Sequence, residues 1–275
     1  MAKQNEIEYA QRMNPEHAAN KPFSDRECGR NLIRLGTVMT LLPAPPARVL
    51  DLGCGTGWTS SFLARAGYEV VGVDLAPEMI RLADQQRAAA GLGNLSFRVS
   101  DYEHLDFRAE FDCAVFFDAL HHADDEALAL RRAGAALKPG GVCVAVEPGF
   151  GHHASADSRH AVAEFGVTEK DMPPDRVVTL ARAAGFTEFR VFPPPDELSK
   201  ALYETRKATI PDPFADFQAS LDTAMNRGLF ARLWWRLRLA VSPARGWRRD
   251  LDYLLCHSRW NGLVLMRKGA APPGA

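Results

Sequence analysis

The fold of this chain is decided by one short stretch, Val49-Leu50-Asp51-Leu52-Gly53-Cys54-Gly55-Thr56-Gly57. An apolar segment runs into three glycines at alternate positions, and a helical pattern over 56–66 follows. A glycine turn between a buried strand and a helix lets a ligand come close to the backbone, because no Cβ stands in the way. The helix that follows presents unpaired N–H groups at its start. The stretch therefore predicts a strand, a turn and a helix with a ligand site at the turn.

The alternation of strand and helix continues along most of the chain. The apolar runs that we expect to form strands are 48–52, 69–73, 95–99, 111–117, 142–147, 188–192 and 262–266. Helical patterns separate most of them, as in 77–90, 126–137 and 174–184. This order predicts an α/β, Rossmann-like, mostly parallel seven-stranded sheet with helices on both faces. We expect an N-terminal helical cover (1–44), a core (45–192), a C-terminal lid insertion (193–261) and a last strand with a tail (262–275).

Composition limits the classes of function. The chain has 275 residues, with 33 Lys and Arg against 34 Asp and Glu. A net charge of −1 argues against a surface that grips nucleic acid. No apolar run approaches the roughly 18–20 residues that cross a bilayer, and the N-terminal residues lack a secretory apolar stretch. Five scattered cysteines argue against a disulfide framework and a CxxC zinc site. We expect a protein of a reducing cytoplasm.

The glycine turn differs from a dinucleotide fingerprint. Trp58 stands where G-x-G-x-x-G requires its third glycine, and Asp51 places a carboxylate beside the turn. A carboxylate repels a pyrophosphate and attracts a ligand with cationic groups, such as S-adenosylmethionine. Asp74 ends the second strand, 21 residues after Gly53, where an acidic residue can accept bonds from ribose hydroxyls. The alternative is that the glycines only make a tight turn and Asp74 only caps the next helix.

These residues resemble the class I S-adenosylmethionine-dependent methyltransferases. Within that class they are most similar to the methyltransferase type 11 enzymes, which act on small molecules. The resemblance covers about residues 45–148 and rests on five segments in the family's order. They are Val49–Gly57, Val71–Leu75, Val99–Tyr102, Phe111–Phe117 and Leu137–Gly141. The resemblance implies fold and cofactor, and says little about the methyl acceptor.

The resemblance also implies the cofactor-binding residues. The residues implied around the amino acid part of the cofactor are Asp51, Gly53, Cys54, Gly55, Thr56 and Gly57. Those implied at the ribose and adenine are Asp74, Leu75, Met79, Asp101 and Tyr102, and those below the methyl donor are Phe117 and Asp118. The N-terminal segment is expected to fold over the cofactor, with Tyr9 and Lys21-Pro22-Phe23 as candidates.

Histidines follow the fourth and fifth expected strands. His121 and His122 follow Asp118, at the carboxyl end of the sheet where open α/β folds bind ligands. A histidine there suits proton removal from a hydroxyl near neutral pH, and the resemblance selects His121. The alternatives are that His121 is a wall of the cofactor site or serves neither role. His122 and Glu147 complete the catalytic candidates, with Glu147 orienting a substrate or a histidine.

The remaining candidates concern the acceptor. His152 and His153 either contact the substrate or belong to a solvated loop. Trp234, Trp235 and Arg248, in the expected lid, could stack on an acceptor ring and pair with its anionic groups. The lid helix alternatively packs on the core, touches a membrane surface or a lipid-linked acceptor, or forms a homodimer interface.

We expect O-methylation of a small molecule, such as a secondary metabolite or a sugar unit, with C- or N-methylation as the alternative. From other classes, the chain could be a nicotinamide-dependent oxidoreductase or a non-catalytic cofactor-binding protein. Metal-dependent O-methyltransferases of this fold carry an Asp-Asn pair after the fifth strand, which Glu147-Pro148 does not supply. The sequence therefore predicts no metal.

Overall fold

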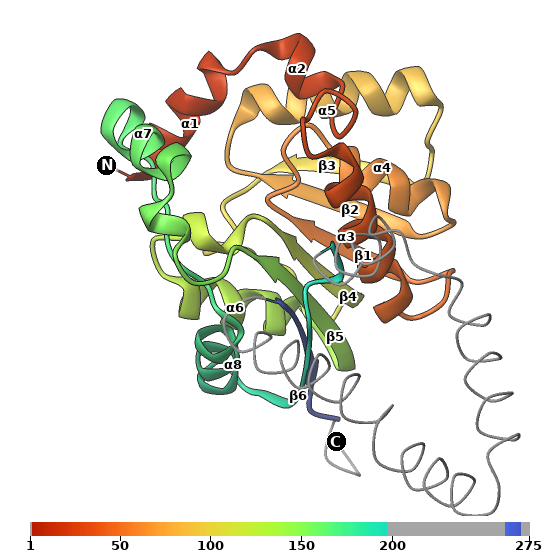
Figure 1. Ribbon diagram of the computed structural model, residues 1–275. Coiled ribbons are helices and arrows are strands. Elements are labelled where there is room, and N and C mark those ends of the chain that lie inside the picture. The colour runs from red at the N-terminus through yellow and green to blue at the C-terminus, as the bar shows by residue number, and fades with distance from the viewer. Residues whose placement is uncertain (1, 197–261, 271–275) are drawn as a thin grey trace, which may run out of the picture. The chain divides into compact units, whose positions relative to one another are not determined.

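A computed structural model describes residues 2–196 and 262–270 of the chain (Figure 1). These residues contain a seven-stranded sheet in the order β3-β2-β1-β4-β5-β7-β6. All neighbouring strands are parallel except β7, which is antiparallel to β5 and to β6. The predicted fold class is therefore confirmed. The strands are β1 (Arg48–Leu52), β2 (Glu69–Asp74), β3 (Leu95–Val99), β4 (Phe111–Phe117), β5 (Leu137–Glu147), β6 (Phe186–Phe192) and β7 (Gly262–Lys268).

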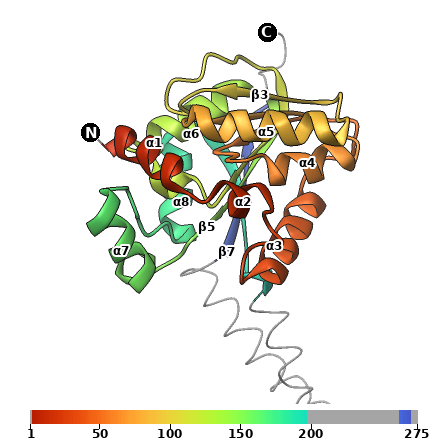
Figure 2. The same ribbon diagram turned by 90° about the horizontal axis from the view of Figure 1, so that it is seen from above.

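Helices cover both faces of the sheet (Figures 1 and 2). The α-helices are α1 (Ala2–Arg12), α2 (Pro15–Ala19), α3 (Cys28–Leu41), α4 (Trp58–Arg65), α5 (Pro77–Ala90), α6 (Glu126–Ala136), α7 (Ala156–Phe165) and α8 (Pro174–Ala183). Two 3₁₀ turns, η1 (Leu120–His122) and η2 (His152–Ala154), follow β4 and β5. Within the described part of the chain, no helix has the length and apolar character needed to span a bilayer.

The strands alternate their side chains between two cores. Leu50 and Phe116 pack on the face of α6 and α8, whereas Val49 and Val115 pack on the face of α3 and α4. All four are at most 1% exposed. Full burial of a side chain of this size stabilises the fold by about 1.5–3 kcal/mol. Burial on both faces explains the continuous apolar runs of these strands and fixes the sheet that carries the site.

Three local expectations differ from the structure. The strand expected over 142–147 begins earlier, at Leu137, and its register with β4 shifts from Phe111 opposite Leu137 to Cys113 opposite Val142. The helix expected from Thr56 begins at Trp58, because Gly57 takes the left-handed conformation at the N-cap. The sequence analysis did not predict α7. The expected lid (193–261) lies almost wholly outside the described residues, and so do its candidates Trp234, Trp235 and Arg248.

Candidate functional site

The glycine turn lies at the carboxyl end of β1, where the strand order reverses. β1 pairs with β2 on one side and with β4 on the other, so chain connections leave the sheet in opposite directions here. Open α/β sheets bind ligands at this switch point. Gly53 and Gly55 both have positive φ, +75° and +53°, which other residues rarely adopt. The backbone N–H groups of Gly53 and Cys54 both donate to the Val73 carbonyl, which anchors the turn to β2.

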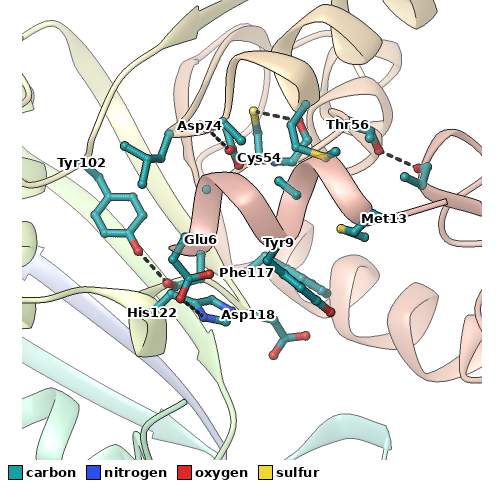
Figure 3. Close-up of a pocket in the computed structure, with 18 of the residues that line it drawn as sticks. Glu6, Tyr9, Met13, Cys54, Thr56, Asp74, Tyr102, Phe117, Asp118 and His122 are labelled. Atoms are coloured by element: carbon teal, nitrogen blue, oxygen red, sulfur yellow. Dashed lines mark hydrogen bonds and ion pairs between the residues drawn. The ribbon is translucent and has the colours of Figure 1, made fainter. Parts of the chain in front are cut away.

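A cavity of about 370 Å³ opens at this turn (Figure 3). It brings together eleven of the thirteen residues expected at the cofactor. They are Gly53, Cys54, Gly55, Thr56, Asp74, Leu75, Met79, Asp101, Tyr102, Phe117 and Asp118. Residues far apart in the sequence therefore share one cavity, because the carboxyl ends of β1 to β4 meet at one edge of the sheet.

The other two expected residues, Asp51 and Gly57, stand behind the cavity wall. The Asp51 side chain is buried, and its Oδ2 accepts hydrogen bonds of 2.5 Å from the hydroxyls of Thr59 and Ser60. Asp51 therefore holds the start of α4. A Cβ on Gly57 would collide with the Phe97 ring, so this glycine is required for packing. Neither residue contacts the cavity directly.

Asp74 holds the turn and also faces the cavity. Its Oδ2 accepts a 2.8 Å hydrogen bond from the Gly55 N–H, and its Oδ1 accepts a 2.9 Å bond from the Ala76 N–H. Burial raises the pKa of Asp74, and the two backbone N–H bonds oppose that shift. Each carboxylate oxygen can accept a second bond, so the group has free acceptor capacity toward a ligand hydroxyl.

The far end of the cavity is closed by Asp101 and Tyr102. The Tyr102 hydroxyl donates a 2.9 Å hydrogen bond to the Ala119 carbonyl, which fixes the ring as a wall. Lys3 forms an ion pair with Asp101, and its Nζ lies 3.0 Å from the Glu103 carboxylate. The Lys3 ammonium thus already uses part of the hydrogen-bonding capacity of the Asp101 carboxylate, which we expect to contact the adenine.

Residues of α1 and α2 line the cavity, and in the fold α1 packs against α5 and α7 while α2 packs against α5 (Figure 2). The Thr56 hydroxyl donates a 2.7 Å hydrogen bond to the Ala18 carbonyl, which ties α2 to the glycine turn. On the other side, the Asn5 amide donates to the Gly166 carbonyl and Glu6 accepts from the Thr168 N–H. Tyr9 and Lys21, two of the expected covering residues, line the cavity; Phe23 is 70% exposed.

His121 and His122 differ in their surroundings. The His121 side chain is buried behind the cavity, and its Nδ1 lies 2.8 Å from Glu147 Oε2. Glu147 also accepts hydrogen bonds from the backbone N–H groups of residues 119–121. His122 lines the cavity, and its Nδ1 lies 2.8 Å from the Thr168 carbonyl and 3.4 Å from Glu6 Oε1. The histidine that reaches the cavity is therefore His122.

Their surroundings shift the pKa values of His121, His122 and Glu147 in different directions. Burial, together with the neighbouring His122, lowers the pKa of His121 to about 3. Burial acts to lower the pKa of His122, but Glu6, Glu169 and the Thr168 carbonyl together outweigh it and raise that pKa to about 9. Burial raises the pKa of Glu147 to about 7, against the three backbone bonds that favour its charged form. At neutral pH the protein therefore holds His121 neutral and His122 charged.

Glu6 and Glu169 also line the cavity, and the sequence analysis missed both. Glu169 lies in an irregular segment after α7, with no motif around it to mark it. Its Oε2 lies 2.6 Å from His152 Nε2 and 3.7 Å from His121 Nε2. His153 pairs with Asp171 away from the cavity, and neither His152 nor His153 is among the residues that line it.

Known proteins resemble this chain over the part that carries the glycine turn. Residues 49–141 match a family described as a methyltransferase domain. The ubiquinone biosynthesis O-methyltransferase of Xanthomonas euvesicatoria pv. vesicatoria (strain 85-10) is 37% identical over 113 residues, which cover 40% of this chain and 47% of that protein. The chain thus spans about half the length of the curated relatives that it matches.

Solved structures share the fold. A phosphoethanolamine N-methyltransferase of Haemonchus contortus, in complex with S-adenosyl-L-methionine, has a TM-score of 0.56 and 19% identity. The match covers 86% of this chain and 52% of that chain. An S-adenosylmethionine-dependent methyltransferase from Mesorhizobium loti has a TM-score of 0.53 and 24% identity, over 62% of this chain and 90% of the other. At these identities the likeness extends to the fold alone.

Proposed function

We propose, for a chain whose residues 49–141 form a class I methyltransferase domain, that the protein transfers the methyl group of S-adenosylmethionine to a hydroxyl oxygen of a small molecule. The negative charge of the cavity is the observation that favours this cofactor. Among the described residues, seven carboxylates line it against two lysines and the charged His122. The carboxylates belong to Glu6, Asp25, Asp74, Asp101, Glu103, Asp118 and Glu169. Such a cavity repels a pyrophosphate and favours a ligand that carries an ammonium and a sulfonium.

The residues present fit this cofactor in three places. The open space beside Gly55, where a Cβ would meet no atom within 4 Å, leaves the backbone of the turn accessible to the amino acid part. Asp74 has acceptor capacity for ribose hydroxyls. The apolar side chains of Leu75 and Met79, with the Tyr102 ring, line the cavity where an adenine would bind.

The chemistry at the acceptor needs alignment and removal of one proton. When bound, the cofactor supplies an activated methyl group, so that the acceptor oxygen forms a C–O bond as the C–S bond breaks and S-adenosylhomocysteine remains. The protein aligns the acceptor beside Phe117 and Asp118. Because His122 in the cavity is charged at neutral pH, the proton leaves toward the neutral His121, which Glu147 holds behind the cavity wall. The names of the curated relatives support a hydroxyl acceptor.

Two experiments test the proposal. Calorimetry with S-adenosylhomocysteine and with NAD⁺ compares the two cofactor classes on the purified chain. We expect binding of the first and none of the second, and the reverse result would show an oxidoreductase. Formation of S-adenosylhomocysteine is then measured with phenols, sugars, amines and carboxylates as acceptors. Turnover with amines but with no hydroxyl compound would replace O-methylation by N-methylation.

A further inference from the structure

Three side chains meet in the wall of the cavity at a spacing that suits a metal ion. His121, His122 and Glu169 each offer one donor atom, and these atoms all lie within 4.8 Å of one another. His121 Nε2 is 3.7 Å from Glu169 Oε2. Ligands bound about 2.0–2.2 Å from one ion lie roughly 3–4 Å apart. The three groups therefore need only small movements, and the release of one proton from His122, to bind the same ion.

Each of the three side chains is also held by an outer partner. His121 Nδ1 donates to the Glu147 carboxylate at 2.8 Å. His122 Nδ1 donates to the Thr168 carbonyl at 2.8 Å, and a carbonyl can only accept. His152 Nε2 bonds to the Glu169 carboxylate at 2.6 Å. Histidines that bind metals almost always donate their second ring nitrogen to a carboxylate or a backbone carbonyl in this way.

The same arrangement leaves acceptors facing one another. With its Nδ1 bonded to Glu147, His121 turns its Nε2 toward the Glu169 carboxylate, 3.7 Å from Oε2 and beyond hydrogen-bond distance. Three carboxylates surround the histidines, those of Glu6, Glu147 and Glu169. Among residues 2–196 and 262–270, the ion pairs of these three carboxylates are with histidines and not with Lys or Arg. A cation between Nε2 and the carboxylate would satisfy both.

We propose that His121, His122 and Glu169 form a binding site for one divalent transition-metal ion such as Zn²⁺. Two imidazoles and one carboxylate are ligands that suit Zn²⁺ and its neighbours, whereas Mg²⁺ and Ca²⁺ prefer sites made of oxygen alone. Three protein ligands leave a coordination position open. His122 and Glu169 line the same cavity as Asp118. An acceptor hydroxyl bound there would lose its proton more readily; this role rests on the proposed function, whereas binding of the ion does not.

The test uses the full chain, purified without a polyhistidine tag and freed of metal with a chelator. Zn²⁺ affinity and stoichiometry are measured by calorimetry, and Co²⁺ absorption reports the coordination. We expect one ion per chain and at least a tenfold weaker affinity in His121→Ala and in Glu169→Gln. Glu147→Gln, which keeps the three ligands and changes the carboxylate that holds His121 and the η1 backbone, should weaken binding by roughly 10–100-fold. The Co²⁺ absorption bands should fade in the same variants.

A matched control is the exposed pair of His160 and Glu164 on α7, 2.9 Å apart, so His160→Ala should leave Zn²⁺ affinity unchanged. Circular dichroism shows whether each variant folds. If His121→Ala does not fold, the Zn²⁺ affinity of Glu169→Gln alone decides the result. Absence of Zn²⁺ binding, equal affinity in Glu169→Gln, or equal competition by Mg²⁺ would overturn the proposal. S-adenosylhomocysteine binding is measured on the same samples. Zn²⁺ binding without S-adenosylhomocysteine binding would support the metal site and refute the proposed function.

Discussion

Replacement of Asp74 by alanine separates the two tasks that the structure gives to this carboxylate. In the free protein the change removes two hydrogen bonds to backbone N–H groups, at 2.8 and 2.9 Å. Bonds to a charged group contribute about 1.5–3 kcal/mol each, and solvent in the cavity replaces part of the loss. We therefore expect a loss of about 3 kcal/mol of stability, which lowers the melting temperature by about 6–12 °C in a chain of this size.

Cofactor binding should fall by a separate amount. If Asp74 also accepts ribose hydroxyls, its loss removes a further 1.5–3 kcal/mol, or roughly a tenfold to hundredfold change in affinity. Asp74→Asn keeps one acceptor oxygen and turns an amide donor toward a backbone N–H, so both effects should be intermediate. The assay is calorimetry with S-adenosylhomocysteine below the melting temperature of each variant.

Asp112 offers the matched control. It lies near the amino end of β4, away from the cavity. There it accepts a 2.8 Å hydrogen bond from the Arg48 N–H and a 2.7 Å bond from Lys138. Asp112→Ala should lower the melting temperature and leave the dissociation constant within about twofold. If Asp74→Ala melts earlier but binds S-adenosylhomocysteine as the unmodified chain does, then Asp74 serves the turn alone and the assignment to the ribose is refuted.

Three further predictions concern the turn, the cover and the lid. Gly53→Ala should destabilise the fold by about 2–5 kcal/mol, because residue 53 has a positive φ and its Cβ would lie 2.5 Å from the Ala119 side chain. The Cβ of Gly55→Ala meets open space, so this change should cost only the strain of a positive φ, about 1–2 kcal/mol. Denaturant titrations measure both free energies. Thr56→Val removes the hydrogen bond to α2 and should weaken S-adenosylhomocysteine binding several-fold with little change in melting temperature. Trp234→Ala and Arg248→Ala should raise the acceptor KM in steady-state assays and leave cofactor affinity unchanged; loss of cofactor affinity alone would contradict an acceptor-binding lid.

Much of the fold could be predicted because its signals are local. The glycine turn, the Pro that opens α5 and the apolar runs of the strands each depend on neighbours in the sequence. The position of Asp74 beside the turn follows from the parallel pairing of β1 and β2. Pro139-Gly140-Gly141 keeps a turn character inside β5, because Gly140 has a φ of +76° and the register with β4 jumps from Leu137 to Val142.

The histidine cluster could not be predicted in the same way. Glu169 approaches His121 only because the segment after α7 returns to the sheet edge, and no periodicity announces that return. Glu147 was expected to orient a histidine, but its three bonds to backbone N–H groups depend on the η1 turn. The sequence therefore identified the residue types at the edge and could not give the contacts among them.

The N-terminal cover has a consequence for the time that a ligand spends in the cavity. Contacts of Lys3, Asn5 and Glu6 hold α1 across the opening, and the Thr56 bond holds α2. A ligand enclosed beneath these helices can leave only when several of these contacts break together. If opening of these helices is slower than the reaction in the cavity, the first turnover runs ahead of the steady state. The rate of the whole cycle would depend on residues 3–18, far in sequence from the groups that react.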